Sequence, residues 1–167
     1  MKTADVIIVG SGASGLFNAL FLPQDYKVIV ITKKEVEESD SFLAQGGISA
    51  LKNPEDYDSY FEDTMKAGHY ENDKGAVEKM IKESPQIIQD LKDFGVRFDL
   101  KDGEIEFTRE GGHSTFRILH HEDLTGKEIT SHLYEEAKKR DNITIMENCT
   151  MIDIIEKDGE CKGIVYK

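Results

Sequence analysis

The chain has 167 residues, with 21 Lys and Arg against 33 Asp and Glu, and a formal net charge of −12 at pH 7. This length is enough for one domain with a substantial core. The acidic balance argues against a nucleic-acid partner, because nucleic-acid binding needs clustered basic side chains. No apolar run approaches the ~20 residues of a membrane-spanning helix, so no membrane span is expected. From Met1 the chain runs directly into a predicted strand and leaves no room for a signal peptide, which favours a cytoplasmic protein.

The first predicted element is a buried strand at residues 6–9, which has the continuous apolar sequence V-I-I-V. The pattern G-x-G-x-x-G follows at once and opens a helix predicted over residues 16–22. Gly10 is expected to make a tight turn, Gly12 to let backbone N–H groups approach a pyrophosphate, and Gly15 to let the helix pack closely on the strand. A diphosphate would then lie at the helix N-terminus, which favours anions. The alternative is an ordinary glycine-rich turn.

A second apolar run at residues 27–32 completes a βαβ unit. In dinucleotide-binding folds a carboxylate commonly ends this strand and accepts a hydrogen bond from the ribose. Here the strand ends in Thr32 and Lys33, and Glu35 follows two residues further on. Taken alone, Lys33 would be compatible with a 2′-phosphate and therefore with NADP.

A loop is predicted over residues 33–47, and it ends in the segment S-F-L-A-Q-G-G at 41–47. Small residues let main-chain N–H groups come close to a ligand, so this segment is a candidate second cradle for a dinucleotide that carries a large ring. The alternative is a glycine turn before a strand. The two cysteines, Cys149 and Cys161, lack C-x-x-C spacing and a nearby His pair, so no metal site is predicted.

The remaining elements are predicted from periodicity and from start and turn signals, such as Asn53 before Pro54 and the Asp-Gly dipeptides at 102–103 and 158–159. In chain order they are helices over residues 54–68, 73–82 and 84–95, a hairpin over 96–107, a loop over 108–125 with a short strand at 116–119, a helix over 126–140, a strand over 142–147 and a hairpin over 150–166. The insertion of about residues 53–126 is too long for a simple crossover. We therefore expect it to form a helical lobe beside the nucleotide site, within one domain that spans residues 1–167.

Three motifs together resemble the succinate dehydrogenase/fumarate reductase flavoprotein family. They are V-I-I-V-G-S-G-A-S-G-L from Val6, V-I-V-I-T-K from Val28 and F-L-A-Q-G-G-I from Phe42. The resemblance covers the whole chain and implies FAD, not NADP. It implies an α/β fold, a Rossmann-like FAD-binding domain with a parallel central sheet, an inserted helical lobe and a β-hairpin or meander at the C-terminal end.

Further motifs resemble the members of this family that oxidise L-aspartate. They are T-R-E-G-G-H-S from Thr108, R-I-L-H from Arg117 and D-L-T-G-K-E from Asp123. The resemblance implies hydride transfer from the α-carbon of L-aspartate to the flavin. The product would be iminosuccinate, in the first step of de novo NAD biosynthesis. O₂ or fumarate would be the electron acceptor, and quinolinate synthase would use the product.

The resemblance places FAD contacts in three segments. The segments are Gly10, Ser11, Gly12, Ala13, Ser14 and Gly15 at the diphosphate, Thr32 and Lys33 near the adenosine, and Asp40, Ser41, Phe42, Leu43, Ala44, Gln45, Gly46 and Gly47 around the ribityl chain and the ring. Relatives that attach the flavin covalently use a His near the position of Asp40. No His stands there in this chain, so non-covalent FAD is expected.

Glu110 is the residue that the resemblance marks for substrate specificity. Relatives that act on succinate or fumarate place Phe before the Gly-Gly pair, whereas L-aspartate carries an ammonium that Glu110 would pair with. The alternative is a carboxylate that caps a loop or pairs with Arg109 or Arg117. His113 and Ser114 resemble positions at the edge of the active site, and loop-stabilising hydrogen bonds are the alternative for both.

The members of this family are considerably longer than this chain, which we therefore interpret as an N-terminal fragment. The fragment would lack the late strand beside residues 6–9, a capping domain and the substrate-binding His and Arg side chains. We expect residues 6–9 to keep one unpaired edge, and the isolated fragment to hold FAD weakly or not at all and to lack oxidase activity. Two alternatives stay open: a fumarate reductase or succinate dehydrogenase flavoprotein, and an inactive FAD-binding fragment.

Overall fold

The computed structural model describes residues 2–167, which form two compact units. One unit comprises the chain up to Ala44 together with Gly126–Lys167, and the other comprises Gln45–Thr125. Met1, the first residue of the predicted leader-free N-terminus, lies outside the described residues. Within residues 2–167, none of the helices combines the length and the apolar character needed to cross a membrane.

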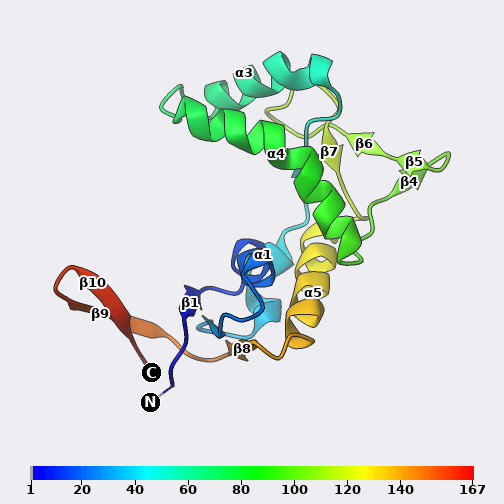
Figure 1. Ribbon diagram of the computed structural model, residues 1–167. Helices are drawn as coiled ribbons and strands as arrows, with labels where there is room; N and C mark the ends of the chain where they lie inside the picture. Colours follow the sequence, from blue (N-terminus) through cyan, green and yellow to red (C-terminus); the bar gives the residue numbers. More distant parts are fainter. Residues whose placement is uncertain (1) are drawn as a thin grey trace. The chain divides into compact units, whose positions relative to one another are not determined.

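The first unit is built on a parallel three-stranded sheet in the order β1–β2–β8. Strands β1 and β8 are labelled in Figure 1. The three strands are β1 (Val6–Val9), β2 (Val28–Ile31) and β8 (Ile143–Met146). All four residues of β2 are buried, whereas Val9 of β1 is 52% exposed. Within residues 2–167, β1 pairs only with β2, which confirms its predicted unpaired edge. The prediction that residues 6–9 are buried on both faces is wrong: Val6, Ile7 and Ile8 are only partly buried, and Ile7 borders a pocket on one face of the sheet.

Two helices accompany this sheet, α1 (Ala13–Phe21) and α5 (Thr125–Lys138). Helix α1 packs on β2 through Ala19, which forms one buried cluster with Val28 and Val30. It begins three residues before the predicted start, directly after Gly12, whose carbonyl accepts from the Leu16 N–H at 3.1 Å.

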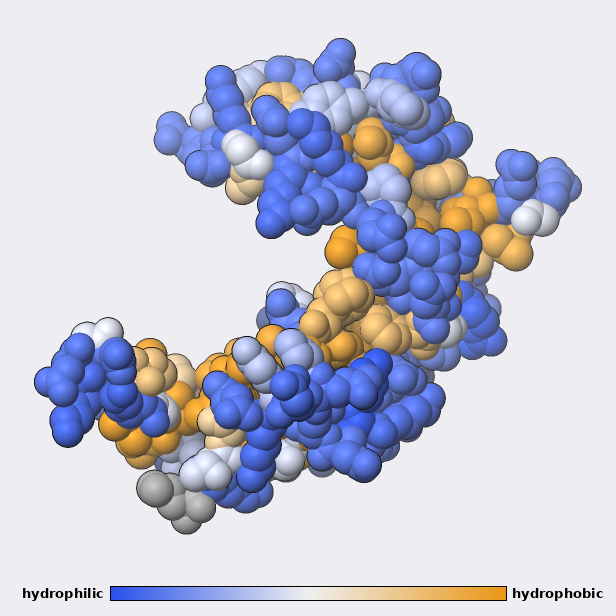
Figure 2. All heavy atoms as spheres, in the orientation of Figure 1, coloured by the Kyte–Doolittle hydropathy of each residue, from blue (hydrophilic) through white to orange (hydrophobic). Residues whose placement is uncertain are grey.

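The predicted C-terminal hairpin is confirmed as β9 (Met151–Lys157) and β10 (Glu160–Tyr166). Its turn residues Asp158 and Gly159 both have positive φ, 58° and 78°, as an Asp-Gly hairpin turn requires. All seven residues of β9 are exposed, including Ile154 at 55%. In Figure 2 the hairpin is hydrophobic at its base and hydrophilic at its tip.

The segment predicted as a loop at 33–47 contains local helical structure. A 3₁₀ turn, η1 (Val36–Glu38), is followed by a one-turn helix, α2 (Asp40–Leu43). The Ser39 hydroxyl accepts from the Phe42 N–H at 3.3 Å and caps α2. The loop prediction is therefore wrong here, because it overlooked a serine cap followed by an acidic first turn.

The second unit begins its helical part as predicted at Asn53, whose Oδ1 accepts from the Asp56 N–H at 3.1 Å. This cap starts the 3₁₀ turn η2 (Pro54–Asp56), which continues into α3 (Tyr57–Ala67). Tyr60, Met65, Val77 and Ile81 form the buried cluster between α3 and the following helix.

That following helix, α4 (Lys74–Asp93), is continuous, although two helices broken before Pro85 were predicted. Proline has no N–H to donate to the carbonyl of Ile81 four residues earlier. The Ser84 hydroxyl donates to that carbonyl instead, at 2.7 Å. The same Oγ accepts from the Leu51 N–H at 2.8 Å, so Ser84 both repairs the helix and anchors a neighbouring segment.

Short strands complete the second unit. An antiparallel sheet has the order β3 (Ile48–Ser49), β7 (Ile118–Leu119) and β6 (Phe107–Thr108). A separate hairpin pairs β4 (Leu100–Lys101) with β5 (Glu104–Ile105). It turns at Asp102 and Gly103, with φ of 54° and 86°, so the predicted turn is confirmed.

Candidate functional site

The first unit holds a pocket of about 480 Å³ at the carboxyl ends of its parallel strands, which we call the strand-end pocket. This edge is where ligands bind in open parallel sheets. The pocket is lined by residues 9–12, 31–35, 38–41 and 149–151. Seven residues predicted to contact FAD are among them: Gly10, Ser11, Gly12, Thr32, Lys33, Asp40 and Ser41.

The glycines of this pocket have separate structural roles. Gly10 has φ of 113°, and its N–H donates to the Ile31 carbonyl at 2.8 Å, which ties the start of the turn to the end of β2. A Cβ on Gly15 would lie 2.1 Å from the Gly10 carbonyl oxygen, so only glycine lets α1 begin so close to this turn. A Cβ on Gly12 would lie 2.8 Å from the Ser41 Oγ, so the two predicted FAD segments meet there.

The residues of this pocket fit a dinucleotide diphosphate. The Ser11 side chain is buried, and its Oγ has no hydrogen-bond partner among the described residues. No side chain caps the N-terminus of α1, and its first turn carries no acidic residue. A buried hydroxyl and uncapped helix N–H groups both gain hydrogen bonds from an anion placed there.

Several residues of this pocket were not predicted from the sequence: Glu35, Glu38 and Ser39 in the loop after β2, and residues 149–151 after β8. A usable signal was present for residues 149–151. Because β8 was predicted as a strand of the same parallel sheet, its carboxyl end must reach the same edge.

Three of the predicted flavin-facing residues belong to the second unit, where they line a pocket of about 370 Å³. We call it the loop pocket. Its residues are Gln45, Gly46, Gly47, Asp99, Thr108, Glu110, His120, Glu122 and Asp123. Four of these carry carboxylates, so the pocket favours a cationic group. The structure thus brings the predicted specificity residue Glu110, which is exposed, beside the predicted flavin-facing segment.

Packing within the second unit also requires glycine at position 47, apart from any contact with a cofactor. A Cβ there would lie 2.2 Å from Ile118 Cγ2 and 2.3 Å from the Leu119 carbonyl oxygen, so the β3–β7 pairing excludes any side chain. This supports, for Gly47, the alternative of a glycine turn before a strand. Around Gly46 no heavy atom of the described chain lies within 4 Å of an added Cβ, so Gly46 lacks this constraint.

The remaining predicted cofactor residues line neither pocket. Ala13, Ser14 and Gly15 form the first turn of α1, and Phe42 and Leu43 complete α2. The Ala44 carbonyl accepts from the Gly126 N–H at 3.0 Å and so holds the start of α5.

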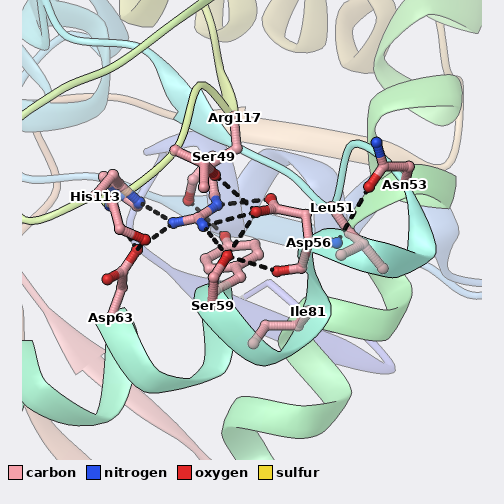
Figure 3. Close-up of polar contacts among 12 residues, drawn as sticks. Ser49, Leu51, Asn53, Asp56, Ser59, Asp63, Ile81, His113 and Arg117 are labelled. Atoms are coloured by element: carbon pink, nitrogen blue, oxygen red, sulfur yellow. Dashed lines mark hydrogen bonds and ion pairs between the residues drawn. The ribbon is translucent and has the colours of Figure 1, made fainter.

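Arg117 lies in the second unit in the middle of a polar cluster with α3 (Figure 3). Its side chain is 0% exposed, and its Nε and Nη2 each lie 2.8 Å from an oxygen of Asp56. Its Nη1 lies 2.6 Å from Asp63 Oδ2, its Nη2 lies 2.7 Å from Ser59 Oγ, and the guanidinium stacks 4.8 Å from the Tyr60 ring centre. These contacts occupy the guanidinium, so Arg117 is not placed to bind a substrate carboxylate.

The ion pairs of Arg117 shift the acidities of both carboxylates. Hydrogen bonds from Arg117 hold the pKa of Asp56 far below its ordinary value, against the opposing effect of burial. Burial acts to raise the pKa of Asp63, but hydrogen bonds from Arg117 and Ser114 outweigh it and lower that pKa. Both carboxylates are therefore charged at neutral pH.

The predicted neighbours of Glu110 have other partners in the structure. Arg117 pairs with aspartates of η2 and α3, and the guanidinium of Arg109 lies over the Phe116 ring at 5.8 Å. Ser114 donates to Asp63 Oδ2 from its N–H at 2.7 Å and from its Oγ at 2.8 Å. These contacts correspond to the loop-stabilising alternative for Ser114, and its place at an active-site edge stays a prediction.

The parallel sheet with a glycine turn at its carboxyl edge defines a dinucleotide-binding domain. The family model described as FAD binding domain matches residues 5–167, and the chain belongs to this family. The predicted cofactor, FAD, and the predicted α/β fold are thereby confirmed.

The proteins similar to this chain include L-aspartate oxidases. The chain is 42% identical over 165 residues to that of Clostridium perfringens and 46% identical over 160 residues to that of Clostridium acetobutylicum. It spans 38% and 37% of the length of these two proteins, while 99% and 95% of this chain is covered.

Solved structures of related flavoproteins share the fold. A variant of E. coli quinol fumarate reductase superposes with a TM-score of 0.91 at 26% identity, over 98% of this chain and 29% of that one. Mycobacterium smegmatis Sdh1 in complex with UQ1 superposes with a TM-score of 0.85 at 28% identity, over 98% of this chain and 30% of that one.

Proposed function

We propose that this chain is the FAD-binding and amine-recognising part of an oxidoreductase that converts L-aspartate to iminosuccinate. When bound, FAD supplies the redox chemistry by accepting a hydride from the substrate. In this proposal O₂ or fumarate takes up the electrons, and the product enters NAD biosynthesis through quinolinate synthase. The similarity to two L-aspartate oxidases supports this choice within the family.

The observation that carries the proposal is the composition of the loop pocket. Gly46, which lacks the packing constraint of its neighbour, and Glu110 line the same cavity. A carboxylate beside the flavin-facing segment attracts the ammonium of L-aspartate and repels dicarboxylates that have no amine. No Lys or Arg of the described chain lines this pocket, so it is suited to hold the ammonium end of the substrate.

We assign the cofactor contacts as follows. Residues 10–15 hold the diphosphate, Thr32 and Lys33 lie near the adenosine, and residues 40–47 surround the ribityl chain and the ring. The buried Ser11 Oγ and the open N-terminus of α1 support the first of these assignments. We treat residues 1–167 as part of one FAD-binding domain, with about residues 53–126 as its helical insertion.

The two cysteines provide a direct test of FAD binding at the strand-end pocket. Cys149 is half-buried and lines that pocket, whereas Cys161 is exposed on β10 and serves as an internal control. In a protein that joins this chain to the remainder found in its relatives, alkylation by iodoacetamide is followed by peptide mass spectrometry over a series of FAD concentrations. We expect FAD to slow the alkylation of Cys149 and to leave that of Cys161 unchanged. Equal rates at Cys149 with and without saturating FAD would contradict the assignment.

A further inference from the structure

The Glu110 side chain stands on a tight turn whose far end is held to α3. The His113 N–H donates to the Glu110 carbonyl at 3.2 Å, and Gly112 within the turn has φ of 86°. Immediately after the turn, Ser114 donates two hydrogen bonds to Asp63 of α3. The position of Glu110 therefore depends on the contacts that hold His113 and Ser114.

His113 is held by the buried guanidinium of Arg117. In Figure 3 the His113 ring points toward Arg117, and its Nδ1 lies 3.1 Å from Arg117 Nη1. A guanidinium carries five N–H donors and no acceptor, so His113 Nδ1 must accept this hydrogen bond through its lone pair. The proton of a neutral His113 is then on Nε2. A protonated His113 would have no lone pair to offer and would place a second cation beside Arg117.

We propose that the Arg117–His113 contact is a pH-sensitive latch on the turn that carries Glu110. Neutral His113, with its proton on Nε2, accepts from Arg117 and keeps the turn against α3. Protonated His113 releases it. His113 is thus a positioning residue that acts through Glu110. The consequence for substrate rests on the proposed function, whereas the latch itself does not.

The charges around His113 set the direction of its titration. Burial and the Arg117 charge lower the pKa of His113, and the carboxylates of Asp63, Asp56 and Glu110 act in the opposite direction. The Tyr60 ring, which contacts His113 edge-on with ring centres 6.1 Å apart, adds no charge. Because the net shift is downward from 6.5, the latch is closed at neutral pH and opens in acid.

The tautomer is tested on the unaltered protein by long-range ¹H–¹⁵N correlation spectroscopy of its histidine rings. At neutral pH we expect His113 to show an unprotonated Nδ1 and a protonated Nε2. A proton on Nδ1, or a doubly protonated ring at neutral pH, would overturn the proposal. This measurement needs neither FAD nor L-aspartate, so its failure is distinct from failure of the proposed function.

The latch is tested with a matched pair of variants. In His113→Asn the amide oxygen lies near the place of Nδ1 and can accept from Arg117, whereas in His113→Gln the polar atoms lie near the place of Nε2 and cannot. Amide hydrogen exchange of residues 110–114, corrected for intrinsic rates, is measured from neutral to acidic pH. We expect exchange in the unaltered protein to rise at least about tenfold below the pKa of His113, to stay slow in His113→Asn and to be fast throughout in His113→Gln.

Two results would contradict the latch. One is the same pH dependence in all three proteins, and the other is equal protection of residues 110–114 in both variants. The amides of Ile81 and Leu91 report whether the second unit is folded in each variant, because both residues are buried in α4 of the same unit as His113.

Discussion

The Oγ of Ser41 lies 2.8 Å from the position that a Cβ on Gly12 would occupy. The glycine turn after β1 and the segment that follows β2 therefore approach each other as closely as a missing side chain allows. Both segments line the strand-end pocket. The absence of a side chain at Gly12 thus keeps open the space in which we place the FAD diphosphate.

Substitutions at two glycines should separate FAD binding from folding. In Gly12→Ala the new methyl meets only the end of the flexible Ser41 side chain, so the fold should remain while FAD affinity falls at least about tenfold. In Gly15→Ala the methyl would meet the Gly10 backbone oxygen at 2.1 Å, and we expect a loss of about 1–3 kcal/mol in the free energy of unfolding. In a protein that joins this chain to the remainder found in its relatives, flavin fluorescence titration measures the FAD affinity and urea unfolding measures the stability. Equal FAD affinity for Gly12→Ala and the unaltered protein would contradict our placement of the diphosphate.

Glu110 should decide between substrates with and without an amine. In a protein that joins this chain to the remainder found in its relatives, Glu110→Gln should raise KM for L-aspartate about tenfold or more, since a charge-assisted hydrogen bond is lost. The effect on succinate should be absent or opposite, because a repelling carboxylate is removed. Steady-state kinetics with both substrates provide the measurement. Equal effects on both would favour the fumarate reductase or succinate dehydrogenase alternative.

The Arg117 cluster should make the second unit sensitive to acid. The pKa values of Asp56 and Asp63 are lowered in the folded chain, so their contribution to stability is complete above the ordinary aspartate value of about 4 and is lost as pH falls through the folded values. We expect the free energy of unfolding, measured with urea, to decline below about pH 4, and to decline less in Asp63→Asn. A decline that is as steep in this variant would show that other groups cause it.

Substitution of Arg117 should lower the free energy of unfolding more than protonation of its aspartate partners does. Arg117→Ala leaves the carboxylates of Asp56 and Asp63, 9% and 16% exposed, without their counter-charge. We expect a loss of about 3–5 kcal/mol in the free energy of unfolding at neutral pH. Lys34 offers a control because its ion pair with Glu38 is exposed to solvent: Lys34→Ala should leave the free energy of unfolding nearly unchanged.

Part of the stabilisation that Ser84 provides should depend on the presence of Pro85 after it. Ser84→Ala leaves the Ile81 carbonyl and the Leu51 N–H without their partner, and should lower the free energy of unfolding by about 1–3 kcal/mol. In the double variant with Pro85→Ala, the new N–H can donate to Ile81, so part of the loss should be recovered. Urea unfolding of the two single variants and the double variant tests this. Additive effects would contradict it.

Local sequence was sufficient wherever one short pattern determines one structure. The glycine turn, the Asn53 cap and both Asp-Gly hairpins were predicted because their backbone geometry depends on adjacent residues only. The break predicted before Pro85 was wrong for the complementary reason. The hydroxyl that replaces the missing hydrogen bond is local, but its second partner, Leu51, comes from a distant part of the chain.

The candidate site shows the same division. The class of ligand could be predicted from local order alone, since a strand, a glycine turn and a helix in succession place N–H groups where a diphosphate binds. The pairing of Arg117 with two aspartates, and the pocket that Gly46 and Glu110 share, are visible only in the folded chain. A charge pairs with whichever opposite charge the packing brings nearest, and that distance depends on how distant segments pack.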